Sequence, residues 1–203
     1  MTVPETGPTG RHDEVEVKLP CEDLDEVRRK LRGLGGEREA PAHFESNDLY
    51  DDENGRLTAE RLVLRLRREP ERAILTFKGP LRFSGSIRAR EERQSVVSNP
   101  EETDAILRGL GFRPRFRYEK KREEWALGNC SIALDETPIG TFVEIEGDPS
   151  DIRRVIAQLG LDFSSAIPYS YARLYAERVM EHLAAKVAAM KRKPAERRIR
   201  GAR

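Results

Sequence analysis

Hydrophobic and polar residues alternate along several short segments, a pattern typical of β-strands that bury one face. In the segment EVEVKLP at residues 14–20, the apolar residues fall on one face and Glu14, Glu16 and Lys18 on the other. The same reasoning predicts further strands at residues 61–67, 73–78, 115–127, 130–135 and 141–146. Residues 86–97 also alternate, but without a clear apolar face.

Helical spacing of apolar residues appears between these strands. One helix is predicted after Cys21, with acids in its first turn and an end near Leu34. A second is predicted after Asn99, which suits the capping position before Pro100. Two more are predicted, one over residues 148–160 and one that starts at Ser170 and runs into a basic tail.

Strands outnumber helices in this layout, so the fold class is α+β with mostly antiparallel strands and helices packed outside. A strand, a helix and an LG dipeptide follow one another near the start of the chain and again at residues 142–160. This repetition is the pattern expected of an internal duplication.

Like charges recur two residues apart on separate strands. Glu144 and Glu146 repeat the spacing of Glu14 and Glu16. The basic pairs are Arg65 with Arg67, Arg88 with Arg90, and Lys120 with Arg122, while Lys78 ends its own strand.

A single pair of this kind usually marks a solvated strand face. Its recurrence favours an antiparallel sheet that closes on itself around a wet, charged interior. Two carboxylates about 4 Å apart repel by roughly 1–4 kcal/mol, so a cation must offset them. Carboxylate oxygens suit Mg²⁺ or Mn²⁺, and paired Arg and Lys side chains suit phosphate oxygens.

Composition limits the alternatives. The 203 residues are 36% charged with a net charge of +1, but residues 191–203 alone carry +6, so the rest of the chain carries −5. Two cysteines without CxxC spacing favour a reducing compartment, and the cytoplasm is the expected location. No signal peptide, no membrane span, no GxxxxGK[ST] and no GxGxxG motif is found.

The sequence resembles the CYTH or triphosphate tunnel metalloenzyme superfamily, whose ExExK hallmark matches Glu14, Glu16 and Lys18. Four further blocks follow in the family's order, and the resemblance spans about Glu14 to Glu177. These blocks are SNDLYDDENGRLTAERLVLRLR, ILTFKGP, LDETPIGTFVEIE and SYARLY.

The resemblance implies a closed eight-stranded antiparallel β-barrel whose lumen holds a triphosphate and a divalent metal, Mg²⁺ or Mn²⁺. The implied metal ligands are Glu14, Glu16, Glu92, Asp135, Glu144 and Glu146. The implied phosphate ligands are Arg65, Arg67, Lys78, Arg90, Lys120 and Arg122. Lys18 would contact the phosphates or help to position the attacking water, and is the expected catalytic residue.

Some positions depart from the family pattern. Gln94 replaces a second acid that family members often carry after the position of Glu92. Pro8 and Thr9 stand where the cyclase branch extends its motif backward with HF. His43 and Phe44 do form an HF pair, but not upstream of ExExK, and this is interpreted as a coincidence.

The predicted function is hydrolysis of inorganic tripolyphosphate or of an organic triphosphate such as thiamine triphosphate. Two alternatives remain: a class IV adenylyl cyclase, and a non-catalytic module that binds polyphosphate or RNA ends. No membrane or nucleic-acid partner is expected, and a homodimer is a candidate assembly. The predicted organisation is a flexible tail at 1–12, the tunnel domain at 13–180, and a helix end with a basic tail at 181–203.

Overall fold

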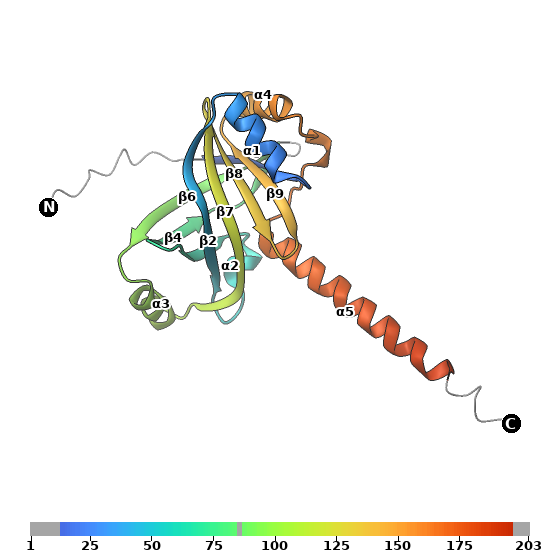
Figure 1. Ribbon diagram of the computed structural model, residues 1–203. Helices are drawn as coiled ribbons and strands as arrows, with labels where there is room; N and C mark the ends of the chain where they lie inside the picture. The colour runs from blue at the N-terminus through green and yellow to red at the C-terminus, as the bar shows by residue number, and fades with distance from the viewer. Residues whose placement is uncertain (1–12, 85–86, 197–203) are drawn as a thin grey trace. The chain divides into compact units, whose positions relative to one another are not determined.

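The computed structural model describes residues 13–84 and 87–196 (Figure 1). The predicted tail at 1–12 and the basic residues 197–203 lie outside this part. The chain divides into two compact units, Met1–Pro168 and Tyr169–Arg203. The strands, all in the first unit, are β1 (Asp13–Pro20), β2 (Glu37–Asp51), β3 (Val63–Arg68), β4 (Ala73–Lys78), β5 (Arg82–Ser84), β6 (Ile87–Val97), β7 (Arg113–Leu127), β8 (Cys130–Thr137) and β9 (Gly140–Glu146).

Helices connect the strands of the first unit. They are α1 (Leu24–Gly33), α2 (Arg56–Ala59), α3 (Pro100–Gly109) and α4 (Pro149–Leu159), followed by a 3₁₀ turn at Phe163–Ser165. Each longer helix begins where the sequence predicts it. Asn99 accepts a hydrogen bond from the backbone N–H of Glu102 at 3.0 Å and so caps α3, as its place before Pro100 indicates.

The strands are all paired antiparallel and close into a ring. The described residues give the order β1-β9-β8-β7-β2-β3-β4-β6, and β6 then pairs back with β1. Eight strands therefore complete the ring, while the short β5 attaches to β6 beside it. The predicted α+β class with a closed eight-stranded sheet and outer helices is confirmed.

The hydrophobic core lies outside the ring. Outward residues of β1, β8 and β9 pack against α1 and α4, which lie together at one end of the sheet (Figure 1). Val17, Leu31 and Ile152 are all fully buried there. Each such side chain contributes about 1.5–3 kcal/mol by leaving water. The outer shell can therefore hold the fold while the inner face of the ring is free to carry charge.

One long strand, β2, was not predicted. Its outward face mixes the aromatic residues Phe44 and Tyr50 with the polar Ser46 and Asp48, so it lacks the regular apolar alternation that indicates a strand. Asp48, for example, faces out and binds Arg68 and Arg117 of the neighbouring strands, each at 2.6 Å. The helix α2 and the strand β5 were also missed, because both are too short to show a period.

The second unit contains the helix α5 (Tyr171–Glu196), which begins next to the predicted start at Ser170. Among the described residues, no helix is long and apolar enough to span a membrane.

Candidate functional site

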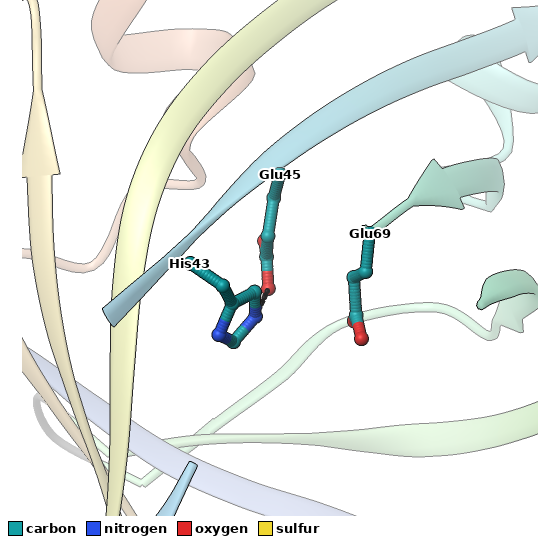
Figure 2. A group of neighbouring side chains, drawn as sticks. All are labelled: His43, Glu45 and Glu69. Atoms are coloured by element: carbon teal, nitrogen blue, oxygen red, sulfur yellow. Dashed lines mark ion pairs between the residues drawn. The ribbon is translucent and has the colours of Figure 1, made fainter. Parts of the chain in front are cut away.

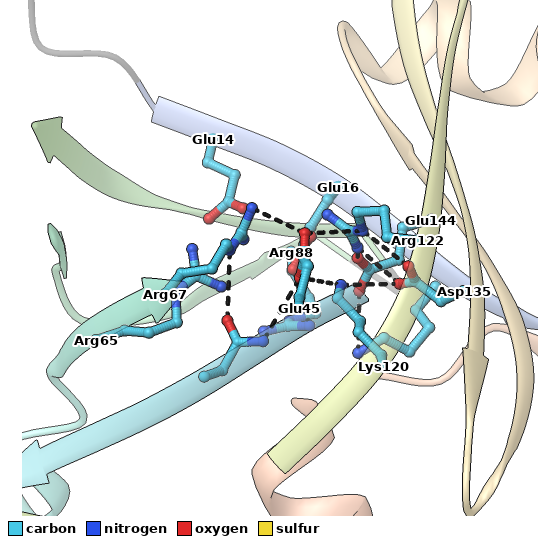
Figure 3. A network of polar contacts seen from close by, with 12 residues as sticks. Glu14, Glu16, Glu45, Arg65, Arg67, Arg88, Lys120, Arg122, Asp135 and Glu144 are labelled. Atoms are coloured by element: carbon cyan, nitrogen blue, oxygen red, sulfur yellow. Dashed lines mark hydrogen bonds and ion pairs between the residues drawn. The ribbon is translucent and has the colours of Figure 1, made fainter. Parts of the chain in front are cut away.

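The charged residues singled out from the sequence lie on the inner face of the ring. Figure 3 shows those of β1, β3, β7, β8 and β9 that it labels, and the strand register puts Lys18, Lys78, Arg90, Glu92 and Glu146 on the same face. Ion pairs connect residues of β1, β3, β4, β6, β7, β8 and β9 that are far apart in the sequence. Lys18 and Lys120 are only 1% and 3% exposed, and Asp135 is fully buried. The sequence segments therefore bring their charges into one interior, as the closed sheet predicts.

One end of the network centres on Glu14 and Lys78. The Lys78 ammonium lies 2.6 Å from Glu14 Oε1 and 2.9 Å from Glu92 Oε2. Arg90 Nε lies 3.4 Å from the other oxygen of Glu14, and Arg65 approaches Glu92 at 3.9 Å. Cations and carboxylates thus alternate across β1, β3, β4 and β6.

Glu146 lies among like charges at this end. It is paired directly with Glu16 across β9 and β1, and Glu14 and Glu92 are close enough to repel it. Partial burial, together with repulsion from these three carboxylates, raises the pKa of Glu146 to about 7. We call Glu14, Glu16, Glu92 and Glu146 the acidic cluster.

A second network surrounds Arg122. Its guanidinium donates two hydrogen bonds to Asp135, at 2.7 and 2.6 Å, and also contacts Glu144. Lys18 lies 3.1 Å from Glu144 on the other side. Burial alone would raise the pKa of Glu144, but the charges of Lys18 and Arg122 outweigh it and hold that pKa well below its usual range. Glu144 is therefore ionised in the folded protein.

The sequence did not single out Glu45, which the structure places at the centre of the basic residues. It is fully buried, with Arg67 at 3.3 Å and Lys120 at 3.6 Å. Burial opposes its charge, but Lys120, Arg122 and Arg67 hold the pKa of Glu45 well below the normal value. Glu45 lies on β2, so the missing strand prediction also hid this residue.

Three other inner-face side chains were not in the predicted set. Arg88 lies 2.9 Å from Glu16, and Arg67 donates to Asn47 at 3.3 Å. His43 lies beside Glu45 (Figure 2). The recurring spacing of Arg88 and Arg90 was a signal for the first, whereas His43 and Asn47 needed the strand β2 to be recognised.

The acidic cluster has the ligand chemistry of a hard divalent cation, although Glu14, Glu16 and Glu92 are each ion-paired with a Lys or Arg side chain. It offers carboxylate oxygens from three strands, with no sulfur or nitrogen ligand among them, as Mg²⁺ and Mn²⁺ prefer. Burial and repulsion from Glu14, Glu16 and Glu92 raise the pKa of Glu146. A bound dication would remove that repulsion.

Fold and site together define a class of protein, in which a ring of antiparallel strands keeps its charged residues inside and its hydrophobic core outside. The model of the CYTH domain matches residues 12–161, so the chain belongs to the CYTH domain family. This confirms the family recognised from the ExExK segment. No curated protein matches the sequence.

Solved structures share the fold. A candidate adenylate cyclase from Vibrio parahaemolyticus is 20% identical, with a TM-score of 0.72 over 82% of this chain and 99% of that one. The PH1819 protein from Pyrococcus horikoshii is 25% identical, with a TM-score of 0.65 over 81% and 99%. HpAC1 from Hippeastrum, named as a candidate adenylyl cyclase with a dominant triphosphatase activity, is 18% identical, with a TM-score of 0.59 over 82% and 95%.

Proposed function

We propose that this protein is a divalent-metal-dependent triphosphatase that binds inorganic tripolyphosphate or an organic triphosphate inside its ring. One observation carries the proposal: the acidic cluster and the rows of Arg and Lys share a single closed interior. A site for metal beside a site for several phosphates suits a substrate with a chain of phosphoryl groups.

The basic residues divide between the two ends of the substrate. Lys78, Arg90 and Arg65 adjoin the acidic cluster, so we assign them to the metal-bound phosphate. Arg67, Lys120 and Arg122 adjoin Glu45 and Asp135, and we assign them to the phosphates further along. Their carboxylate partners hold these cations in place before substrate binds, which lowers the cost of organising the site.

The metal, when bound, supplies charge neutralisation and a more acidic bound water. We assign its binding to the acidic cluster. We also assign Asp135 and Glu144, the other two predicted ligands, to the metal, for which they would leave their ion pairs with Arg122, Lys120 and Lys18. Lys18 reaches the interior from the same strand as Glu14 and Glu16, and there it positions the attacking water or the reacting phosphate.

The adenylyl cyclase reaction is the second candidate, because two of the structural neighbours are named for it. The HpAC1 name also states that triphosphatase activity dominates in that protein. Both reactions use a triphosphate and differ in the nucleophile, which is water in one and the 3′-hydroxyl of ATP in the other.

Cys21 and Cys130 are both free, which accords with a cytoplasmic location.

A product assay tests the proposal. The purified full chain is incubated with Mg²⁺ or Mn²⁺ and, separately, with tripolyphosphate, thiamine triphosphate and ATP, and the products are resolved. We expect metal-dependent release of orthophosphate. Formation of cyclic AMP and pyrophosphate from ATP would instead identify a cyclase, and tight binding without turnover would identify a binding module.

Variants assign the activity to the interior. We expect Glu16→Ala and Glu144→Ala each to abolish turnover, because each removes a carboxylate from the proposed metal site, and circular dichroism should show an intact fold. Glu22→Gln is the matched control, since Glu22 is exposed and lies outside the network. Turnover at the wild-type rate in Glu16→Ala or Glu144→Ala would refute the metal assignment.

A further inference from the structure

A second group of potential metal ligands lies apart from the acidic cluster. His43 and Glu45 are inward residues of β2, and Glu69 follows the end of β3 (Figure 2). One ligand atom from each of the three lies within 4.8 Å of the others. Unlike the acidic cluster, this group contains an imidazole.

The ring of His43 is oriented by its backbone. Its Nδ1 lies 3.0 Å from the carbonyl oxygen of Pro41, which can only accept, so Nδ1 carries the proton. The neutral tautomer then has its lone pair on Nε2. Metal-binding histidines commonly donate their other N–H to a backbone carbonyl in this way, because the hydrogen bond fixes the ring for the metal.

The lone pair of His43 faces a carboxylate. Nε2 lies 3.7 Å from Oε1 of Glu45, which is fully buried. Neither of these two buried atoms has a hydrogen-bond partner, although the Arg67 guanidinium forms an ion pair with the same Glu45 oxygen. The two atoms point at one position that either a proton on Nε2 or a metal cation can fill, and the neighbouring Glu45 carboxylate raises the pKa of His43, so the proton competes with the metal.

We propose that His43, Glu45 and Glu69 form a second divalent-cation site that selects Zn²⁺ or Mn²⁺ over Mg²⁺. One nitrogen and two carboxylate ligands suit the borderline metals, whereas Mg²⁺ prefers oxygen alone. The site goes beyond the proposed hydrolase, and its existence does not depend on that activity.

Arg67 is the cation with which the metal competes. Its Nη1 lies 3.3 Å from Oε1 of Glu45 and 3.4 Å from Oε1 of Glu69. Arg72 binds the second oxygen of Glu69 at 2.6 Å, so Arg67 is the cation that occupies Oε1. Lys120 and Arg122 also lie within 4 Å of Glu45. The metal must therefore displace Arg67, and removing Arg67 should strengthen metal binding rather than weaken it.

The test is a calorimetric titration with ZnCl₂. The full chain is first stripped of metal and then kept in excess Mg²⁺, so that the acidic cluster is filled before Zn²⁺ is added. We expect wild type to bind one Zn²⁺, and His43→Gln to bind it at least about tenfold more weakly, since even the loss of an outer-shell partner costs that much. Arg67→Met should bind more tightly than wild type. His182→Gln serves as the control for nonspecific imidazole binding and should match wild type.

Circular dichroism confirms that each variant is folded, and the Co²⁺ absorption spectrum gives an independent readout. We expect a visible Co²⁺ band in wild type and in Arg67→Met that is absent from His43→Gln. Zn²⁺ affinity in His43→Gln equal to wild type would overturn the proposal. So would the absence of any Zn²⁺ binding in both wild type and Arg67→Met, which would show that a proton on His43 offsets Glu45 instead.

Discussion

At the scale of single residues, the charge of Glu146 depends on its neighbours more than on its own chemistry. Its pKa of about 7, against an ordinary value of 4.5, results from partial burial and from Glu14, Glu16 and Glu92. Between these two pH values the unfolded chain releases this proton while the folded protein keeps it. Without metal, the protonated side chain of Glu146 therefore contributes to the free energy of unfolding below pH 4.5, and this contribution is lost as the pH rises to 7.

This loss of stability with rising pH gives a prediction for Glu146→Gln in the presence of EDTA. The variant should be more stable than wild type at pH 8, by an amount on the order of 1 kcal/mol, because solvent screens part of the repulsion. At pH 4.5 the two proteins should differ little. Thermal unfolding of both proteins across this range measures the difference.

Mg²⁺ provides the control for that experiment. It should raise the melting temperature of wild type at pH 8 more than that of Glu146→Gln, since the variant has one carboxylate fewer in the acidic cluster. A difference between the two proteins that is the same at pH 4.5 and pH 8 would contradict the assignment of the raised pKa.

At the scale of elements, the end of β9 is fixed against its neighbours by a glycine. Gly147 has a φ of 156°, and its N–H donates to the carbonyl of Val15 on β1 at 3.1 Å. A Cβ at this position would lie 2.9 Å from Cys130 Sγ and 3.0 Å from the carbonyl oxygen of Asn129. The close approach needs a residue without a side chain, directly after Glu146.

Gly147→Ala should therefore destabilise the protein by about 1–3 kcal/mol, through steric overlap and backbone strain. Urea unfolding of wild type and variant measures the change. Gly109→Ala is the matched control, because Gly109 ends α3 with open space around the added methyl group. That change should be neutral or stabilising by up to about 1 kcal/mol. Equal effects at the two sites would refute the steric argument.

At the scale of the whole first unit, stability and chemistry occupy opposite faces of the same ring. The apolar core lies between the ring and the helices α1 and α4, and the charged network lies within. A substitution in the apolar core should lower stability without changing turnover in the charged interior, as long as the protein stays folded.

Leu31→Ala tests this separation. Leu31 belongs to α1 and is fully buried in the core, so truncation should cost about 2–5 kcal/mol in the free energy of unfolding. Turnover of the proposed triphosphate substrate at low temperature should stay close to wild type. Leu110→Ala, at a side chain that is 69% exposed, should change stability by no more than about 0.5 kcal/mol. Loss of activity in folded Leu31→Ala would show that the two layers are coupled.

The sequence by itself determined the fold class, most of the strands and helices, and the charged pairs of the inner face. Alternation on β1 and β9 is strong because one face is apolar and packs on helices, so period and composition agree there. Both like-charged pairs could then be assigned to the same interior: Glu14 with Glu16, and Glu144 with Glu146.

Only the tertiary structure decided which charges meet. Pairing across the ring joins Lys78 to Glu14 and Arg122 to Asp135, and such pairs depend on strand order and register rather than on local pattern. The strand β2, with His43 and Glu45, also needed the structure, because its outward face mixes aromatic and polar residues and so shows no regular period. Local periodicity reports a hydrophobic face, whereas long-range closure of the sheet decides what the opposite face surrounds.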